Sequence, residues 1–236
     1  MAEKGREKGS VPIIAVDGPS GSGKGTVSRI LAGALGWHLL DSGALYRLVA
    51  LAGMLREFAP DDETGHAALA AGLDVRFEAD AEGAERVLLE GRDVTRELRA
   101  ETTGNAASRV AVMPAVREAL LGRQRGFAVP PGLVADGRDM GTVVFPGAGL
   151  KVFLTASAEE RARRRYKQLK EKGLAANLAG LSQEILERDR RDSDRPVAPL
   201  RPSPDAVVID STGIPVEEVV DRVLALAALR FPSIRS

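Results

Sequence analysis

The sequence contains no cysteine and few aromatic residues. Its 236 residues include one tryptophan, two tyrosines and six phenylalanines. The absence of cysteine excludes a disulfide framework, a thiolate zinc site and a cysteine nucleophile. Lysine and arginine together number 33, as do aspartate and glutamate, so the formal net charge is zero. A nucleic-acid partner is therefore disfavoured, because nucleic-acid-binding proteins combine a basic excess with aromatic stacking surfaces.

Long apolar runs are also missing. No stretch approaches the roughly 20 apolar residues of a membrane-spanning helix, and the charged start MAEKGREKGS lacks the apolar region of a secretory signal. We expect residues 1–10 to form a disordered tail and residues 11–236 to form one domain. These features predict a cytoplasmic protein without a membrane partner. No obvious exposed apolar face favours assembly, so we expect a monomer.

Short apolar runs alternate with amphipathic stretches along the chain. Continuous apolar strands separated by helices are typical of a parallel sheet that is covered on both sides. The pattern predicts an α/β fold with a mainly parallel five-stranded sheet flanked by helices. The five predicted strands are VPIIAV before Asp17, WHLLD to Asp41, GLVAD to Asp136, LKVFL before Thr155 and AVVID to Asp210.

One segment departs from this alternation. Leu73–Leu98 consists of short alternating runs separated by the turn-like strings ADAEGA and EGRD, which predicts a small antiparallel β insertion. Further along, Ser157 and Glu160 form a capping box before a long helix. Gly173 suits the end of that helix, and Pro215 suits the first turn of the last one.

The stretch VDGPSGSGKGT, ending at Thr26, carries the strongest chemical signal. It follows a predicted strand and precedes the helical pattern TVSRILAGAL, which is the context of a phosphate-binding P-loop. Glycines allow successive N–H groups to face one anion, and Lys24 supplies a mobile charge for the β- and γ-phosphates. The flanking elements disfavour the alternative, a glycine-rich turn with a surface lysine. The predicted ATP-binding residues are Gly18, Pro19, Ser20, Gly21, Ser22, Gly23, Lys24, Gly25 and Thr26.

Gly25 departs from the general motif, in which serine or threonine directly follows the lysine. That hydroxyl ligates Mg²⁺ in P-loop NTPases, but here the first hydroxyl comes one residue later, at Thr26. We therefore expect the cofactor Mg²⁺ to be held mainly by phosphates and water, with Thr26 and Asp136 in contact through water. The GKGT form resembles the nucleoside monophosphate kinases.

Charged residues follow two further predicted strands. DSGALYR begins at Asp41, and DGRDMG begins at Asp136. Both lie at the carboxyl ends of strands, where ligands bind in open α/β sheets, and arginine forks match phosphate oxygens. Either string alone would favour a solvated ion pair in a loop. Two of them beside a P-loop favour a small phosphorylated acceptor.

Two arginine-rich stretches add further candidates. Arg188, Asp192 and Arg195 are spaced to share one helix face, with Pro196 ending the helix, although an exposed salt-bridged helix has the same spacing. ERARRRYK, ending at Lys167, has more arginines than i,i+4 pairing can neutralise. It suits either a solvated basic face or a lid that brings positive charge to phosphates.

Several strings occur together in one chain and in a fixed order: GPSGSGKGT, WHLLDSGALYR, NAASRVA, VREALLGRQR, ADGRDMGTVVFP, ERDRRDSDRPVAPL and DST. With them the sequence closely resembles the bacterial cytidylate kinases, from Val11 to Ala227. The resemblance implies a P-loop kinase that transfers the γ-phosphoryl group of ATP to CMP or dCMP. A P-loop kinase for another nucleoside monophosphate is the alternative. A GTPase is disfavoured because the guanine-reading N-K-x-D string is absent.

The resemblance also implies roles for individual residues. A helical lid would cover residues 157–180, with Arg161 and Arg164 facing the reacting phosphates, and an enlarged NMP-binding insertion would cover residues 65–105. The implied catalytic residues are Lys24, Arg138, Asp139 and Arg195. The implied CMP-binding residues are Ser42, Ser108, Arg117 and Asp139 at the nucleoside, Tyr46 in the pocket wall, Arg47, Arg138 and Arg195 at the phosphate, and Arg188 and Asp192 at the pentose hydroxyls.

Overall fold

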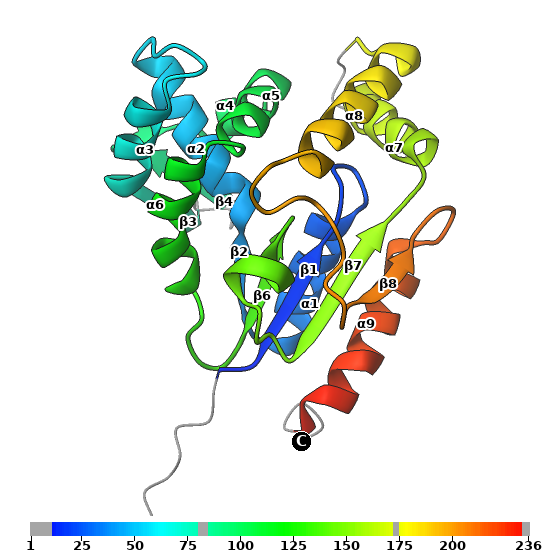
Figure 1. Ribbon diagram of the computed structural model, residues 1–236. Helices are drawn as coiled ribbons and strands as arrows, with labels where there is room; N and C mark the ends of the chain where they lie inside the picture. Colours follow the sequence, from blue (N-terminus) through cyan, green and yellow to red (C-terminus); the bar gives the residue numbers. More distant parts are fainter. Residues whose placement is uncertain (1–10, 80–84, 172–174, 233–236) are drawn as a thin grey trace, which may run out of the picture.

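A computed structural model describes residues 11–79, 85–171 and 175–232. The predicted tail at residues 1–10 and the predicted helix end at Gly173 lie outside these ranges. The centre of the fold is a parallel sheet with the strand order β2-β6-β1-β7-β8 (Figure 1). Its strands are β1 (Ile13–Asp17), β2 (His38–Asp41), β6 (Leu133–Gly137), β7 (Leu150–Thr155) and β8 (Val207–Asp210).

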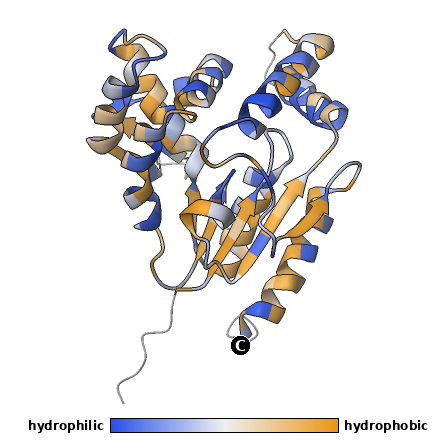
Figure 2. Cartoon of the chain, in the orientation of Figure 1, coloured by the Kyte–Doolittle hydropathy of each residue, from blue (hydrophilic) through white to orange (hydrophobic). Residues whose placement is uncertain are grey.

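Successive residues of the central strand pack against opposite layers of helices. Ile14 and Val16 join the apolar cluster on the face covered by α1 and α9, whereas Ala15 joins the cluster on the face covered by α2. All three residues are fully buried, so this strand has to be apolar throughout. Figure 2 shows the same apolar character along the sheet. The five predicted strands are confirmed, and the covering helices are α1 (Lys24–Leu35), α2 (Ser42–Leu55) and α9 (Val216–Arg230).

Between α2 and β6 the chain forms a lobe beside the carboxyl end of the sheet, which we call the insert lobe (residues 63–125; Figure 1). Its small sheet is antiparallel with the order β3-β4-β5, as predicted. The last part of the predicted β segment is helical instead: Asp93 accepts hydrogen bonds from the N–H and hydroxyl of Thr95 at 3.0 and 2.7 Å, a local turn that lies just before α4, whose N-cap residue is Val94. The lobe contains α3 (Glu63–Ala71), β3 (Val75–Ala79), β4 (Glu85–Leu89), β5 (Arg92–Asp93), α4 (Thr95–Leu98), α5 (Glu101–Val110) and α6 (Pro114–Arg125).

Opposite the insert lobe stand α7 (Ala158–Glu171) and α8 (Leu178–Ser193), which pack together and which we call the lid hairpin (Figure 1). Half of the predicted capping box is confirmed, because Ser157 Oγ accepts a hydrogen bond from the N–H of Glu160 at 3.2 Å. The N–H of Ser157 donates instead to Thr212 Oγ1 at 2.9 Å, and Glu160 pairs with Arg164. Figure 2 shows that these helices are largely hydrophilic, as expected of a pair that covers little core.

Two predicted helix boundaries shift in the structure. Helix α8 ends at Ser193, so Arg195 lies beyond the helix rather than on its face with Arg188 and Asp192. Pro215 is the residue before α9 and has an extended backbone rather than a helical one. Within the described ranges, no helix is both long and apolar enough to cross a membrane.

Candidate active site

The loop between β1 and α1 has a backbone that requires glycine. Gly21 and Gly23 have φ angles of 79° and 92°, in the left-handed region. A Cβ atom on Gly18 would lie only 2.0 Å from the carbonyl oxygen of Leu154 in β7, so no side chain fits there. No side chain caps the start of α1. The loop therefore presents backbone N–H groups and a helix N-terminus to an anion, as the P-loop prediction requires.

A cavity of about 700 Å³ opens between this loop and the lid hairpin, and we call it the larger cavity. Ser20 to Thr26, seven of the nine predicted ATP-binding residues, line it, whereas Gly18 and Pro19 do not. The Lys24 ammonium donates a hydrogen bond to the carbonyl oxygen of Pro19 at 3.2 Å. The lid hairpin contributes Arg161, Arg164 and Arg165 to the wall.

The first two of these arginines hold the P-loop in place. Arg161 donates to the carbonyl oxygen of Ser20 at 3.1 Å and forms a bidentate pair with Asp189 at 2.9 and 2.5 Å. Arg164 donates to the carbonyl oxygen of Ser22 at 3.2 Å and to Ser211 Oγ at 3.1 Å. Both arginines line the cavity, and their predicted contact with the reacting phosphates remains a prediction. In this structure most of their donors bond to the loop backbone and to Ser211, Glu160 and Asp189.

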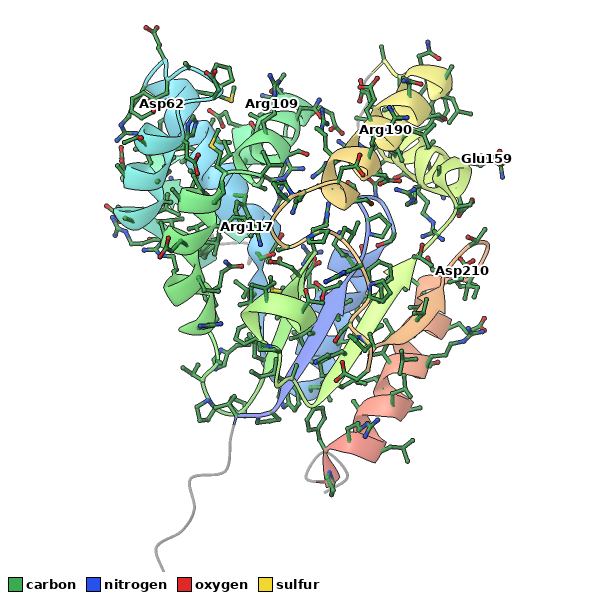
Figure 3. The ribbon with its side chains drawn as sticks, in the orientation of Figure 1. Asp62, Arg109, Arg117, Glu159, Arg190 and Asp210 are labelled. Atoms are coloured by element: carbon green, nitrogen blue, oxygen red, sulfur yellow. The ribbon has the colours of Figure 1, made fainter. Side chains whose placement is uncertain are left out.

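A second cavity of about 220 Å³ lies below the insert lobe, and we call it the smaller cavity. Nine of the ten predicted CMP-binding residues line it, and Asp192 does not. They come from six separate elements or loops, and Arg117 is labelled in Figure 3. The nine are Ser42, Tyr46 and Arg47 on α2, Ser108 on α5, Arg117 on α6, Arg138 and Asp139 after β6, Arg188 on α8, and Arg195 beyond it.

One wall of the smaller cavity is a buried ion pair. Arg117 donates to Asp139 Oδ2, and the two side chains are only 8% and 4% exposed. Arg117 also donates to the carbonyl oxygen of Ala111 at 3.2 Å and lies over the ring of Tyr46, 5.9 Å from its centroid. Ser108 Oγ is buried and has no hydrogen-bond partner in the described part of the chain. This wall therefore offers one hydroxyl and one carboxylate oxygen to a polar ligand.

A second buried network positions the arginines of the opposite wall. Asp192 is 1% exposed and accepts from Arg138 Nε at 2.7 Å and from Arg195 Nη2. Burial alone would raise the pKa of Asp192, but these two arginines outweigh it and lower the pKa to about 2. Arg47 is held separately by the carbonyl oxygens of Leu98 and Ala100, at 3.0 and 3.1 Å.

Arg188 differs from the other arginines of the cavity wall. It makes no hydrogen bond or ion pair with the described residues, and its Nε is buried without a partner. Burial, followed by the nearby charge of Arg138, lowers its pKa to about 9. An arginine in this condition has most of its donors free for a ligand anion.

The two cavities share part of their lining. The residues that line both are Ser20, Lys24, Gly25, Arg47 and Arg188, so ligands in the two cavities would meet there.

Asp136 and Lys24 form the charged floor between the cavities. Burial raises the pKa of Asp136 and lowers the pKa of Lys24. Asp136 Oδ1 is buried without a hydrogen-bond partner among the described residues. Its Oδ2 lies 3.2 Å from the position that a Cβ on Gly25 would take, so a side chain at this position would crowd the carboxylate.

These residues fit a divalent cation that is held mainly through phosphates and water rather than by side chains. The described ranges contain no group of three or more histidine, cysteine, aspartate or glutamate side chains that could hold a metal by themselves. Thr26 lines the larger cavity, and the free oxygen of Asp136 is suited to accept from a metal-bound water. The predicted site for Mg²⁺, held through phosphates and water, agrees with this donor set.

Sequence reasoning missed several residues of the site. Asp17 accepts hydrogen bonds from the N–H groups of Met140 and Gly141, both at 2.8 Å. Burial raises its pKa to about 6, although those two hydrogen bonds oppose the shift. Its place at the end of a strand, like that of Asp41 and Asp136, was the available signal. Asp189 and Ser211 were also missed as supports of the arginines, because their partners are distant in sequence.

Comparison with known proteins gives one family. The sequence model described as "Cytidylate kinase" matches residues 14–229. The chain is 57% identical to a cytidylate kinase of Colwellia psychrerythraea over 218 residues, 92% of this chain and 96% of that one. It is 60% identical to a cytidylate kinase of Pseudomonas savastanoi pv. phaseolicola over 220 residues, 93% and 96% of the two chains. Among solved structures it is similar to a gluconokinase from Sinorhizobium meliloti 1021, with 20% identity, 93% coverage of both chains and a TM-score of 0.45. The matched family model and these two relatives establish that the chain belongs to the cytidylate kinase family.

Proposed function

We propose that this protein transfers the γ-phosphoryl group of ATP to CMP or dCMP, giving ADP and CDP or dCDP. Membership of the cytidylate kinase family supports this reaction. The observation that carries it is the shared border of the two cavities, where Lys24 and Arg188 line both. Two nucleotides that occupy the cavities would bring their phosphates together at that border, where positive side chains reduce their mutual repulsion.

In this proposal ATP occupies the larger cavity, with its phosphates against the N–H groups of Ser20 to Thr26. Lys24 adds a point charge at the β- and γ-phosphates. Mg²⁺, when bound, neutralises charge on these phosphates, and Asp136 and Thr26 hold it through water. Arg161 and Arg164 keep the loop in the shape that directs its N–H groups to the phosphates.

The phosphate of the acceptor is assigned to Arg47, Arg138 and Arg195. No general base is needed, because the attacking atom is already a phosphate oxygen. Asp192 is satisfied by Arg138 and Arg195 and lies outside the cavity lining, so we assign it the positioning of these two arginines. Arg188 keeps its predicted contact with the pentose.

The polar groups of the smaller cavity favour cytosine over uracil. Asp139 can accept a hydrogen bond from the N4 amino group, while Arg117 and Ser108 can donate to N3 and O2. Uracil reverses the donor and acceptor at positions 3 and 4. It would leave a buried group unpaired, at a cost of about 1–3 kcal/mol. We therefore expect turnover of UMP to be about 5- to 150-fold slower than that of CMP.

A coupled assay of ADP release, with ATP and Mg²⁺, tests the proposal against CMP, dCMP, UMP, AMP, GMP and no acceptor. We expect fast turnover with CMP and dCMP, slow turnover with UMP and little ATP hydrolysis without acceptor, since closure excludes water. A preference for another monophosphate would retain the P-loop assignment and overturn the roles of Asp139, Arg117 and Ser108.

The monomeric state and the cytoplasmic location remain predictions. Gel filtration tests the monomeric state, because a monomer has a mass of 25.0 kDa.

A further inference from the structure

Asp17 immediately precedes the P-loop, yet its side chain accepts hydrogen bonds from the segment that follows β6 rather than from the P-loop. Both carboxylate oxygens accept backbone hydrogen bonds at 2.8 Å, Oδ1 from Met140 and Oδ2 from Gly141. These two N–H groups begin η1 (Met140–Val144), a short π-helix that directly follows Arg138 and Asp139. Asp17 is only 5% exposed, so its carboxylate accepts hydrogen bonds from these backbone groups rather than from solvent.

The residue that ordinarily caps such a turn is engaged elsewhere. Asp139 occupies the N-cap position of η1, but its side chain makes no capping hydrogen bond and is paired with Arg117 in the smaller cavity. The first N–H groups of a helix need an acceptor when they are buried. Asp17 supplies it from the neighbouring strand, which leaves the carboxylate of Asp139 free to face the cavity.

The packing around Asp17 fixes this arrangement closely. Asp17 is opposite Gly137 in the parallel register of β1 and β6, so its side chain reaches the loop that follows β6. A Cβ on Gly141 would lie 3.1 Å from Cδ of Lys151 and 3.4 Å from Oδ2 of Asp17. The backbone of Gly141 therefore sits tightly between these two side chains, and a change in Asp17 would displace it.

We propose that Asp17 is a positioning residue for the acceptor pocket: it caps η1 in place of Asp139 and thereby sets the backbone from which Arg138 and Asp139 extend. The inference rests on the proposed function, because only that function makes the smaller cavity a binding site for CMP. It assigns to the last residue of the P-loop strand a role in binding CMP rather than ATP. It also explains the residue type, since an asparagine has one acceptor and would turn an N–H group toward one of the two backbone donors.

Separate binding measurements on Asp17→Asn test the proposal. Isothermal titration calorimetry at about pH 8 keeps the wild-type carboxylate ionised, because its pKa is about 6. We expect the Kd for CMP to rise about tenfold, equivalent to about 1.4 kcal/mol, and the Kd for ATP with Mg²⁺ to stay within about twofold. Amide exchange, followed by NMR, should become faster at Met140 and Gly141 and stay slow at Ile14 and Val16 in β1.

Asp62→Asn is the matched control. Asp62 also caps a helix, accepting from the N–H of Gly65 at 2.9 Å, but it lies at the start of α3, away from both cavities (Figure 3). Its substitution should leave both Kd values unchanged. Asp17→Ser, with a smaller acceptor, provides a second variant and should also weaken CMP selectively.

The outcomes separate the possibilities. Three outcomes would overturn the proposal. If CMP and ATP binding weaken equally, or if both Asp17 variants fail to fold, Asp17 contributes to the stability of the whole fold rather than to the acceptor pocket. If CMP binding is unchanged, Asp17 does not position that pocket. If the wild-type protein bound no CMP, the proposed function would fail instead. The exchange rates at Met140 and Gly141 would then still decide whether Asp17 holds this backbone.

Discussion

The two cavities share a border but are built in different ways. In the larger cavity the predicted ATP-binding residues are seven consecutive residues, Ser20 to Thr26, and Arg161 and Arg164 donate hydrogen bonds to the backbone of this loop from the lid side. The smaller cavity presents charged side chains that come from α2, α5, α6, the loop after β6 and the end of α8. The predicted phosphate-binding loop is continuous in sequence, whereas the predicted acceptor-binding residues are brought together by the fold.

This difference suits the two ligands of the proposed reaction. A backbone cradle recognises phosphate groups without regard to the base, so it can bind the donor through features common to all nucleoside triphosphates. A network of paired side chains is specific, because each buried donor or acceptor must be matched by the ligand. Substitutions should therefore affect the two ligands separately.

The largest effect is expected for Lys24→Met, because this side chain supplies mobile charge at the cavity border. We expect kcat to fall about 10³-fold, as for the loss of a group that stabilises developing charge, with CMP binding changed little. Steady-state kinetics with calorimetry of CMP alone would measure both quantities. Lys170→Met, on the exposed side of α7, is the control and should retain full activity. Near-normal turnover of Lys24→Met would remove this residue from the mechanism.

A smaller loss, confined to the acceptor, is expected for Arg138→Ala. The substitution removes a phosphate-facing guanidinium and one partner of Asp192, so kcat/KM for CMP should fall about 10²-fold while KM for ATP stays within about threefold. Arg222→Ala, which breaks an exposed pair with Glu218 on α9, provides the matched arginine control. Parallel losses for both substrates would contradict the separation of the two cavities.

The buried carboxylates Asp17 and Asp192 should respond to pH in opposite directions. The folded-state pKa of Asp17, about 6, exceeds the ordinary aspartate value of 3.8 because the side chain is buried, so its stabilising contribution is present at low pH and is lost as pH rises through about 6. Asp192, at about 2, contributes stability above about pH 4 that is lost as pH falls toward 2.

Urea unfolding measures the first of these effects. From about pH 4.5 to 7.5 we expect the free energy of unfolding of Asp17→Asn to rise by about 2 kcal/mol relative to the wild type, since the variant cannot ionise. Asp62→Asn should show no such trend. A difference that is constant with pH would mean that the carboxyl of Asp17 has an ordinary pKa in the folded protein.

The smallest effect concerns the ion pair between Glu101 on α5 and Arg165 on α7, which joins the insert lobe to the lid hairpin. Both side chains are partly exposed and line the larger cavity. In Glu101→Gln, Arg165 loses its carboxylate partner and is free to meet phosphates, so KM for ATP should fall about twofold. Glu218→Gln is the matched control, and a rise in KM would show instead that the pair helps to form the ATP site.

The parts of the molecule that sequence reasoning predicted well are those with local causes. The five strands were recognisable because burial on both faces makes them continuously apolar. The P-loop was recognisable because its backbone takes positive φ angles that favour glycine. Element boundaries were predicted less well, because the hydrogen bonds at helix ends leave little trace in the apolar pattern. Thr95–Leu98 form α4 rather than part of the β insertion, and α8 ends at Ser193, before Arg195. The NMP-binding and lid segments, and the roles of individual site residues, remain predictions.

The sequence by itself determined the fold class and the P-loop with Lys24, and through family resemblance it predicted a set of acceptor residues. Only the tertiary structure decided how those residues are paired: Asp139 with Arg117, Asp192 between Arg138 and Arg195, and Asp17 with the backbone of η1. The physical reason is that hydrogen bonds and buried charges act over a few ångströms in space. Asp17 and Met140 are 123 positions apart along the chain, and only the alignment of neighbouring parallel strands brings them together.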